Sequence, residues 1–466
     1  MVANFVNGTQ ISATGSAAQD TSPLIDPATG EEFGRAVVSR GAEVDAAVQA
    51  AADAFPVWSR TTPGERQHAL LKLADLLEAN AEVVADAEVR ETGKVRSVLL
   101  DEEIPQCADQ IRFFAGAARA LGTAAAGEYV PGHTSYQRRE AVGVIAQITP
   151  WNYPLMMAVW KIAPALAAGN TVVLKPADTT PSSTVLLASL AAQVLPAGVF
   201  NVVLGDRDTG RSLVEHPVPA MVSLTGSTRA GIEVARSAAA TVKRTHLELG
   251  GNAPVLVFDD VDVATAAEGV VGAAFYNAGQ DCTAASRVLV HSAVHDEFVA
   301  ALVKAASAQV PGTDFGPLNS QAQLDRVLGL LSRSTATVHC GGKRHGSAGF
   351  FLEPTVVSGL TQDDELVQEE AFAPLITVQS FADDDEAISL ANGVPQGLAS
   401  SIWTRDTGRV AALTARLDFG IVWVNTHGLV ASEMPHGGFG ASGYGKDLSM
   451  HGLEDYTRVK HVMIAH

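Results

Sequence analysis

Cysteine is scarce in this chain, which holds three among 466 residues: Cys107, Cys282 and Cys340. They are odd in number, widely spaced and form no CxxC pair, so the sequence predicts neither a disulfide framework nor a zinc or dithiol site. Cys107 stands at helical spacing beside apolar residues and Cys340 closes a strand-like run, so both are predicted to be packing thiols. Cys282 differs, because its neighbours in YNAGQDCTAASR are small and polar.

Positive charge is also in short supply. The chain has 32 Lys and Arg against 51 Asp and Glu, a net charge of −19 at pH 7, and this field repels nucleic acid and anionic lipid headgroups. No uncharged apolar stretch approaches the roughly 20 residues that cross a bilayer, and the N-terminus lacks the basic and apolar regions of a signal peptide. We therefore expect a cytoplasmic protein with no nucleic-acid or membrane partner.

Internal repeats and low-complexity tracts are absent from the sequence as well. Hydrophobic residues make up 47% of it and charged residues 18%, while 42 Gly and 21 Pro follow no period. This composition is typical of a compact globular protein and not of a disordered one. At 466 residues the chain is too long for a single simple core, so two or three domains are expected.

Apolar periodicity predicts an α/β protein. The first third favours helices, as in 44–55, where apolar residues recur on one helical face. From residue 142 onward, short apolar runs alternate with helical stretches, which indicates βαβ units around a mainly parallel, doubly wound sheet. The predicted strands are 142–148, 171–175, 200–205, 221–226 and 253–258. The alternation begins again after residue 260, which indicates a second α/β domain.

Two segments are candidates for nucleotide binding. In TGSTRAG, Gly226 and Ser227 stand between a strand and a helix, where backbone N–H groups favour a phosphate; a steric use of glycine is the alternative, since the spacing departs from GxGxxG. Lys175 and Asp178 follow the strand 171–175 and would hold a ribose. Asp178 would repel a 2′-phosphate, which favours NAD over NADP, and a solvated ion pair is the alternative.

Cys282 and Glu248 are the candidates for chemistry. A thiol among polar neighbours is placed for reaction, but only the thiolate attacks an electrophile, so backbone donors, a cation or a base must assist its ionisation. Asp281 opposes ionisation if its charge faces the sulfur, so its side chain is expected to point away, toward a substrate. Glu248 stands in an apolar run before two glycines, where a buried carboxylate is suited to act as a general base.

Eight motifs together resemble the aldehyde dehydrogenase superfamily over almost the whole chain. They are PWNYPLMM, KPAD, TGSTRAG, LELGGNAP, NAGQDC, FGPL, EEAFAPL and PHGGFGASGYGKD, in the order and spacing of that family. The resemblance implies a Rossmann-type NAD-binding domain over 1–122 and 142–247 and an α/β catalytic domain over 248–430. It also implies a small β oligomerisation arm, with bridging segments at 123–141 and 431–466.

The resemblance also assigns chemical roles. Cys282 would add to the aldehyde carbonyl to form a thiohemiacetal, with Asn152 and the Cys282 N–H as the oxyanion hole. Hydride would pass to the nicotinamide and leave a thioester, and Glu248 would activate the water that hydrolyses it to a carboxylic acid. No metal is implied. A non-catalytic nucleotide-binding protein is the remote alternative, which the joint presence of these three residues disfavours.

The NAD contacts that the resemblance implies come from seven positions: Trp151, Lys175, Asp178, Gly226, Ser227, Glu370 and Phe372. Two features depart from the family pattern. Ala373 replaces the usual glycine of EEAFAPL, and its methyl group is expected to shift the nicotinamide side of the site. The connection VPGTDFGPL is shorter than usual, which is expected to trim a surface turn.

Within the family, the likeness is greatest to γ-aminobutyraldehyde dehydrogenases, through segments such as VNTHGLVASEMPHGG and SGYGKDLSMHGLEDYTRVKHVM. That subgroup oxidises ω-aminoaldehydes, so the expected substrate is 4-aminobutanal from polyamine breakdown; betaine aldehyde or a broad range of aliphatic aldehydes is the alternative. A substrate cation requires acids and aromatic faces. The candidates, each of which a solvated acid or a packing aromatic explains equally well, are Asp109, Asp281, Tyr153, Trp160 and Trp423.

The C-terminal motif GYGKDLSMHGLEDYT resembles the oligomerisation segment of the family, which extends a strand into a neighbouring subunit. The resemblance implies a homotetramer, with a dimer as the alternative. The expected partners are therefore a small-molecule aldehyde and further copies of the same chain.

Overall fold

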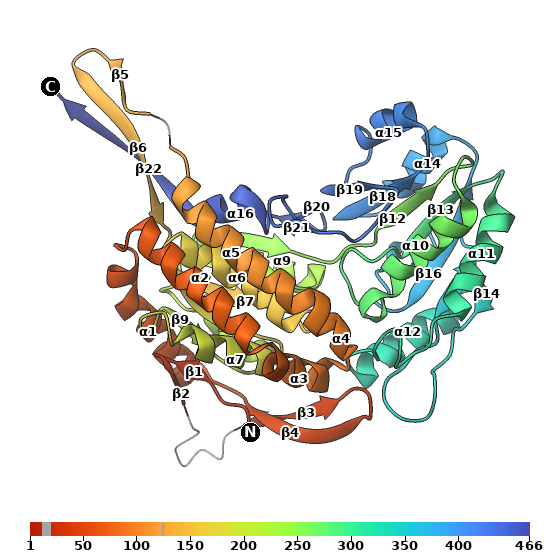
Figure 1. Ribbon diagram of the computed structural model, residues 1–466, viewed down its shortest axis with the longest axis horizontal. Coiled ribbons are helices and arrows are strands. Elements are labelled where there is room, and N and C mark those ends of the chain that lie inside the picture. Colours follow the sequence, from red (N-terminus) through yellow and green to blue (C-terminus); the bar gives the residue numbers. More distant parts are fainter. Residues whose placement is uncertain (12–19, 124) are drawn as a thin grey trace.

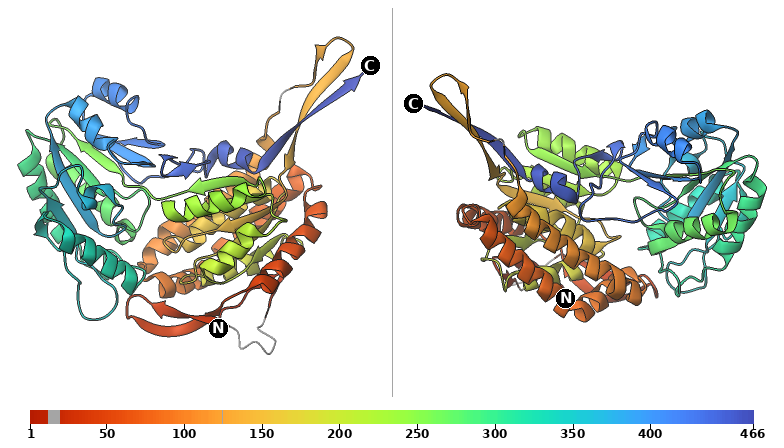
Figure 2. Two further views of the ribbon diagram at one scale, coloured as in Figure 1. Left: turned by 180° about the vertical axis from the view of Figure 1, so that it is seen from behind. Right: turned by 45° about the horizontal axis from the view of Figure 1, so that its top comes forward.

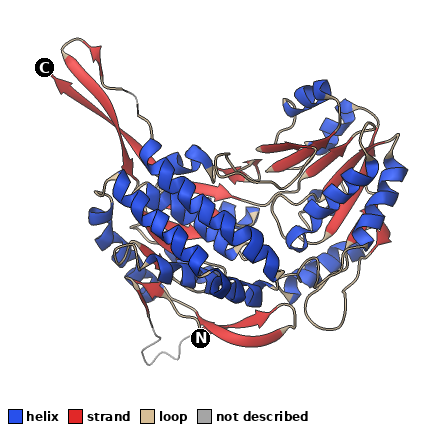
Figure 3. Cartoon of the chain, in the orientation of Figure 1, coloured by secondary structure: helices blue, strands red, loops and turns tan. Residues whose placement is uncertain are grey.

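The computed structural model describes residues 1–11, 20–123 and 125–466. It shows two lobes, each built on its own β-sheet, and a β arm that projects from the first lobe (Figure 1). Helices pack against both sheets (Figure 3). The molecule therefore belongs to the α/β class that the apolar periodicity predicted.

The first sheet has eight strands, and the five central ones run parallel. Ile148 pairs with Lys175 on one side and with Leu224 on the other, so three strands end at the same edge. Open α/β sheets bind their ligands at this edge. In spatial order the strands are β2 (Thr9–Gln10), β1 (Phe5–Val6), β9 (Phe200–Val202), β8 (Thr171–Lys175), β7 (Val144–Ile148), β10 (Met221–Thr225), β11 (Arg244–Glu248) and β21 (Gly443–Tyr444).

Helices cover both faces of this sheet because its central strands are apolar on both sides. In β8, Val172 and Leu174 pack into one hydrophobic cluster, while Val173 packs into another on the opposite face. The first cluster is completed by α2 (Pro63–Ala79), α3 (Ala81–Thr92), α5 (Ile104–Ala120), α6 (Pro154–Ala167) and α7 (Ser182–Ala191). The second is completed by α1 (Gly41–Trp58), α8 (Arg207–Glu215) and α9 (Thr228–Ala239).

The second lobe is built on a seven-stranded sheet in which only β14 and β15 pair antiparallel among the described residues. Its strands are, in spatial order, β14 (Thr337–Cys340), β15 (Thr355–Ser358), β16 (Leu375–Phe381), β13 (Arg287–His291), β12 (Pro254–Val257), β18 (Ala399–Trp403) and β19 (Ile421–Val424). Its main helices are α10 (Val263–Phe275), α11 (His295–Ser307), α12 (Gln321–Arg333), α14 (Asp384–Ala391) and α15 (Thr407–Thr414). Residues 249–253 join the two lobes, which face each other in both views of Figure 2.

The arm consists of β5 (Gly127–Val130), β6 (His133–Ala141) and β22 (Thr457–Ala465). β6 and β22 pair antiparallel along their whole length, and they extend away from the first lobe (Figures 1 and 2). The C-terminal segment 431–466 thus contributes an edge strand, β21, to the first sheet as well as one strand of the arm.

The start of the chain differs from the prediction of helices alone. β1 extends the first sheet, while β3 (Thr21–Asp26) and β4 (Glu31–Val37) form an antiparallel hairpin before the first helix. Leu24 is the one buried residue of β3, and the strand contains Pro23, so β3 lacks the alternation of apolar and polar residues that marks a strand in sequence. None of the described helices combines the length and the hydropathy that a bilayer-spanning segment needs.

Candidate active site

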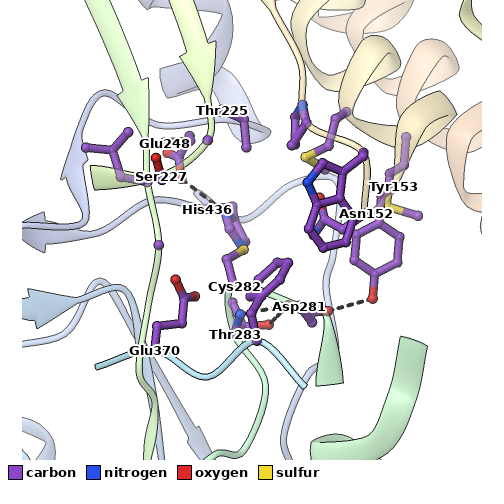
Figure 4. A pocket seen from close by; sticks show the side chains of 18 of the residues that line it. Asn152, Tyr153, Thr225, Ser227, Glu248, Asp281, Cys282, Thr283, Glu370 and His436 are labelled. Atoms are coloured by element: carbon purple, nitrogen blue, oxygen red, sulfur yellow. Dashed lines mark hydrogen bonds and ion pairs between the residues drawn. The ribbon is translucent and has the colours of Figure 1, made fainter. Parts of the chain in front are cut away.

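A cavity of about 1380 Å³ lies where the two lobes meet. Its walls come from the carboxyl ends of β7, β10 and β11, from the loops around β13 and β16, and from the C-terminal segment. Figure 4 shows the labelled side chains that point toward one another there. The predicted site residues that line it are Trp151, Asn152, Tyr153, Trp160, Gly226, Ser227, Glu248, Asp281, Cys282, Glu370 and Phe372.

Cys282 follows α10 through a strained turn. In the 3-10 turn Tyr276–Gly279, three successive residues have positive φ: Asn277 at 50°, Ala278 at 56° and Gly279 at 66°. A non-glycine residue in this left-handed region of backbone conformation costs on the order of 1–3 kcal/mol of conformational free energy, and the conformation persists only where surrounding contacts stabilise it. The turn therefore directs Cys282 toward the cavity instead of continuing the helix.

The glycine pair after Glu248 makes room for the cysteine loop. A Cβ on Gly251 would lie 2.0 Å from the carbonyl oxygen of Cys282, and one on Gly250 would lie 2.3 Å from Glu370 Oε2. No side chain fits at Gly251, because the clash there is with backbone, whereas a Cβ on Gly250 would require the Glu370 side chain to move. The glycines of LELGGN thus bring the connection between the lobes into direct contact with the cysteine and with Glu370.

Asn152 stands beside the cysteine loop, although it belongs to the other lobe. Its Nδ2 donates a hydrogen bond to the carbonyl of Gln280 at 3.0 Å, and Asn277 Nδ2 donates to the carbonyl of Asn152 at 2.9 Å. These bonds bridge the two lobes and hold Asn152 at the wall of the cavity. An amide N–H next to the backbone N–H of Cys282 has the chemistry of an oxyanion hole.

The thiol of Cys282 is held in its neutral form. Burial raises its pKa well above the usual value, and the carboxylates of Asp281, Glu370 and Glu248 raise it further. The side chain of Asp281 points as the sequence predicted, away from the sulfur and toward Tyr153. It accepts hydrogen bonds from the Tyr153 hydroxyl and from the backbone and hydroxyl of Thr283, each at 2.7 Å.

Glu248 ends β11 and is buried, with 3% of its surface exposed. It lines the same cavity as Cys282, so the fold brings together the two residues that the sequence selected for chemistry. Its nearest titratable partner is His436, whose Nδ1 lies 3.6 Å from Glu248 Oε2. His436 was not predicted as a site residue, because nothing in the sequence around a histidine of a glycine-rich loop indicates that the loop lies beside Glu248.

One end of the cavity offers groups suited to a dinucleotide. Ser227 caps α9, its hydroxyl accepting from the backbone N–H of Ala230 at 3.3 Å, and the first turn of this helix faces the cavity. The rings of Trp151 and Phe372 meet edge to face at 5.4 Å. Burial raises the pKa of Glu370 to about 8, although the Gly251 N–H donates to its carboxylate.

Lys175 and Asp178 differ from this group, since neither lines the cavity among the described residues. Lys175 is buried, and its Nζ donates to the carbonyls of Pro176 and Gly205 at 2.6 and 3.0 Å. Burial lowers the pKa of Lys175 to about 8, although the Asp178 carboxylate opposes this. Asp178 is exposed on the loop that follows β8, so a ribose contact from this pair stays a prediction.

The substrate candidates fall into two groups. Tyr153, Trp160 and Asp281 line the cavity, whereas Asp109 and Trp423 do not belong to its described walls. Asp109 accepts a hydrogen bond from Ser432 at 2.7 Å, and the indole of Trp423 donates to the carbonyl of Leu429 at 2.9 Å. The two predicted substrate contacts therefore stay predictions: both side chains contact the loop 427–432, and neither is among the described lining residues.

An acid that the sequence did not single out takes their place. Glu102 lines the cavity from the π-helical turn Leu99–Glu103 and accepts a hydrogen bond from the Tyr276 hydroxyl at 3.2 Å. In the sequence Glu102 belongs to the acidic run DEE, which looks like an ordinary solvated helix face. Ala373, by contrast, packs in a hydrophobic cluster of the second lobe and is not among the lining residues.

A cluster of ligand-type side chains lies behind Glu248, where one atom each of His246, Glu248 and Asp447 fall within 4.8 Å of one another. Lys161 Nζ lies 2.7 Å from the Asp447 carboxylate, and His246 Nε2 lies 3.2 Å from it. Burial and Lys161 lower the pKa of His246, but Asp447 and Asp455 outweigh them and raise it to about 9. The cluster thus already holds two cationic side chains, which disfavours a metal ion.

Residues 14–462 match the model of the aldehyde dehydrogenase family. Betaine aldehyde dehydrogenase of Mesorhizobium japonicum is 39% identical over 458 residues, covering 95% of this chain and 93% of that protein. Betaine aldehyde dehydrogenase of Bacillus subtilis is 39% identical over 480 residues, covering 98% of this chain and 96% of that protein.

A solved structure agrees with these relatives. The crystal structure of betaine aldehyde dehydrogenase from Staphylococcus aureus in complex with NAD+ is 32% identical and superimposes with a TM-score of 0.96. The match covers 100% of this chain and 95% of that one. These matches confirm the family that the eight motifs indicated. The chain therefore belongs to the aldehyde dehydrogenase family.

Proposed function

We propose that this aldehyde dehydrogenase uses NAD to oxidise an aldehyde that carries a cationic nitrogen, and that betaine aldehyde is a better substrate than 4-aminobutanal. The observation that carries the proposal is one cavity lined by Cys282, Asn152 and Glu248 together with the carboxylates of Glu102 and Asp281. Cys282, Asn152 and Glu248 would form and hydrolyse an acyl-cysteine intermediate. The carboxylates of Glu102 and Asp281 provide a negative electrostatic potential for the substrate cation.

The groups at the cofactor end fit the parts of NAD. The first turn of α9, with Ser227 at its cap, offers backbone N–H groups to a diphosphate, where the helix dipole favours anions. The buried acid of Glu370 suits ribose hydroxyls, and the rings of Trp151 and Phe372 suit the flat nicotinamide. NAD, when bound there, supplies the hydride acceptor of the reaction.

Cys282 begins the reaction as a nucleophile. Because its thiol is neutral at rest, it must pass its proton to a base as its sulfur bonds to the carbonyl carbon. The electron pair of the carbonyl then moves to its oxygen, where the Asn152 amide and the Cys282 N–H donate hydrogen bonds to the negative charge. Loss of hydride from the same carbon leaves a thioester on Cys282.

Glu248 serves the second half of the reaction. Its buried carboxylate takes a proton from water as that water attacks the thioester carbon, and the carbon–sulfur bond breaks to release the carboxylic acid. The neutral thiol is regenerated when sulfur regains a proton. Residues from both lobes are needed, since Glu248 ends β11 and Asn152 follows β7 in the first lobe, whereas Cys282 belongs to the second lobe.

The hydrogen bonds of Asp281 support a quaternary ammonium over a primary one. Its carboxylate already accepts three hydrogen bonds from Tyr153 and Thr283. It therefore offers charge rather than further acceptor positions, and a trimethylammonium group requires charge and aromatic faces but no acceptor. The relatives described above, which are named betaine aldehyde dehydrogenases, support the same choice.

The β arm supports association between copies of this chain, for which we propose a homotetramer with a dimer as the alternative. It exposes apolar side chains that a monomer would leave in water: Tyr129, Val130, Val459, Met463 and Ile464. Light scattering after size exclusion measures the mass directly, and a purely monomeric protein at micromolar concentration contradicts this proposal.

Kinetics with matched aldehydes tests the substrate proposal. Betaine aldehyde and its neutral isostere 3,3-dimethylbutanal have the same shape, so their ratio of kcat/KM isolates the effect of charge. We expect betaine aldehyde to be preferred by roughly tenfold or more, consistent with about 1–3 kcal/mol of discrimination, and 4-aminobutanal to fall between them. Equal values for the charged and neutral aldehydes contradict cation recognition.

Three variants separate chemistry from specificity. Cys282→Ala should abolish turnover while NAD binding persists, and retained turnover contradicts the assigned nucleophile. Glu102→Gln should reduce the preference for betaine aldehyde over its neutral isostere. The matched control is Glu268→Gln, which changes an exposed acid of α10 outside the cavity walls and should leave the preference unchanged.

A further inference from the structure

The PHGG segment at 435–438 passes directly over the carboxylate of Glu248. A Cβ on Gly437, whose φ is +149°, would lie 2.4 Å from Glu248 Oε1. Only glycine therefore fits at this position. The preceding residue, His436, presents its Nδ1 at 3.6 Å from Glu248 Oε2, and the dashed line in Figure 4 joins the two side chains.

The His436 ring is fixed in this orientation. Its edge packs against Trp160 with ring centroids 4.8 Å apart, and its backbone N–H donates to the carbonyl of Asp447 at 2.9 Å. His436 is 5% exposed and Glu248 is 3% exposed, yet among the described residues neither Nδ1 of the ring nor Oε1 of the carboxylate has a hydrogen-bond partner. A buried polar atom left without a partner costs about 1–3 kcal/mol, so the 3.6 Å approach of the ring to the carboxylate is not maintained by a hydrogen bond.

Other charged groups around the pair are already engaged. Asp447 is bound by Lys161 and His246, and His246 also lies 3.0 Å from Asp455. Lys446 donates to the carbonyls of Gly437 and Gly438. From the second lobe, Cys282 faces Glu248, and Glu370 faces Cys282. Within the described residues, these are the titratable groups that surround His436 and Glu248 from α6, β11, the C-terminal segment and the loops of the second lobe.

We propose that His436 accepts, at Nδ1, the proton that Glu248 removes from the hydrolytic water. The proposal rests on the function proposed above, in which Glu248 is the general base. Glu248 is buried and must release a proton in every turnover, and the unpartnered ring nitrogen beside it is directed at its carboxylate. Since His436 acts through Glu248 and not on the thioester, it is a positioning residue.

The step balances without a further reactant. Water loses one proton to Glu248 as its oxygen bonds to the thioester carbon, and the carbon–sulfur bond breaks with its electron pair on sulfur. The sulfur takes the second proton of that water from the acid product, so Cys282 is again a thiol and the product leaves as a carboxylate. The proton on Glu248 then moves to Nδ1 of neutral His436. The imidazolium releases it to water in the cavity, and Glu248 is again a carboxylate for the next turnover.

The test separates hydride transfer from hydrolysis. In His436→Phe the replacement ring keeps the contact with Trp160 but has no nitrogen. We expect first-turnover NADH formation to stay at the wild-type rate while steady-state turnover falls by roughly a hundredfold, the low end of general acid–base contributions. Mass spectrometry of the intact protein should then detect the acyl adduct on Cys282 during turnover. The control His339→Phe changes an exposed histidine of β14 and should alter neither phase.

A second variant defines what the ring nitrogen does. In His436→Asn the amide nitrogen occupies the position of Nδ1 and donates a hydrogen bond, but it cannot accept a proton at neutral pH. We expect hydrolysis as slow as in His436→Phe, and in both variants the rise of the hydrolysis rate with pH that neutral imidazole requires should disappear. Wild-type hydrolysis in His436→Asn overturns the proposal, as does loss of both phases together in His436→Phe.

A parallel measurement on Glu248→Gln keeps this inference apart from the proposed function. If Glu248→Gln traps the acyl adduct and His436→Phe does not, Glu248 remains the base and only the role of His436 is overturned. If neither variant slows hydrolysis, the assignment of Glu248 itself is wrong. The double variant should be no slower than Glu248→Gln alone, because His436 has no proton to accept once the carboxylate is absent.

Discussion

Asp447 offers the sharpest test of how the C-terminal segment is tied to the first sheet. Its carboxylate is 1% exposed, lies 2.7 Å from Lys161 Nζ and 3.2 Å from His246 Nε2, and Lys161 itself is 0% exposed. Asp447→Asn keeps the shape of the side chain but leaves Lys161 without a buried counter-charge. Breaking a buried ion pair from one side costs about 3–5 kcal/mol, so we expect that loss in unfolding free energy.

The pH dependence of this loss follows from His246. Its pKa rises from 6.5 to about 9 in the folded protein, and at about 1.4 kcal/mol per pH unit this corresponds to about 3 kcal/mol. Because the folded pKa lies above the unfolded one, this stabilisation is complete below about pH 6.5 and is lost as pH rises through about 9. The pKa of Asp447 is lowered from 3.8 in the folded protein, so the stabilisation by its carboxylate is lost as pH falls below that value. The difference in unfolding free energy between wild type and Asp447→Asn should therefore be widest between pH 3.8 and 6.5 and narrow toward pH 9.

Thermal unfolding across this pH range, followed by calorimetry, measures both effects. The control is Asp385→Asn, since Asp385 also lies 2.7 Å from a cation, Arg416, but is 85% exposed; its effect should stay below about 1 kcal/mol. Lys161→Met combined with Asp447→Leu should recover stability, because an apolar pair carries no buried charge. If Asp447→Asn melts like Asp385→Asn at every pH, the buried network does not stabilise the fold.

Two further predictions concern the cysteine loop. Asp281→Asn should lower the pKa of Cys282, because among the neighbouring charges the Asp281 carboxylate raises that pKa most. The rate of alkylation of Cys282 by iodoacetamide, measured without NAD, should then begin to rise at a lower pH than in wild type. An unchanged pH profile of alkylation contradicts this effect of Asp281 on the thiol. Gly251→Ala should reduce turnover by at least roughly a hundredfold, as expected for a misplaced reactive group, since its Cβ would lie 2.0 Å from the Cys282 carbonyl oxygen. The control Gly116→Ala adds a Cβ that meets nothing within 4 Å, so activity should persist; full activity of Gly251→Ala argues against the close contact.

Much of the fold was accessible from local pattern. The strands predicted at 142–148, 171–175 and 221–226 correspond to β7, β8 and β10, because buried parallel strands are apolar on both faces and leave a clear signal. Polar β3 left no such signal and was missed. Cys282 lines the cavity, and its polar and glycine-rich neighbours already argued in the sequence against a place in a core.

The partners of these residues were not accessible in the same way. Asp109 was an acid of the expected type, yet it accepts a hydrogen bond from Ser432, and Glu102 from the preceding helical turn lines the cavity instead. Glu102 belongs to the π-helical turn Leu99–Glu103 and Asp109 to α5. No local pattern in the sequence shows which of two exposed acids lies beside a cavity.

The sequence by itself determined the family, the α/β layers and the residue types of the site, since motifs and apolar periodicity are local properties of the chain. Only the tertiary structure decided that His436 lies against Glu248. That contact depends on β21 pairing with β11, where Gly443 pairs with Glu248, and so carries the PHGG segment across the carboxylate. Local periodicity reports that a segment is buried but not against which distant segment, because burial lowers the free energy equally well with any apolar partner.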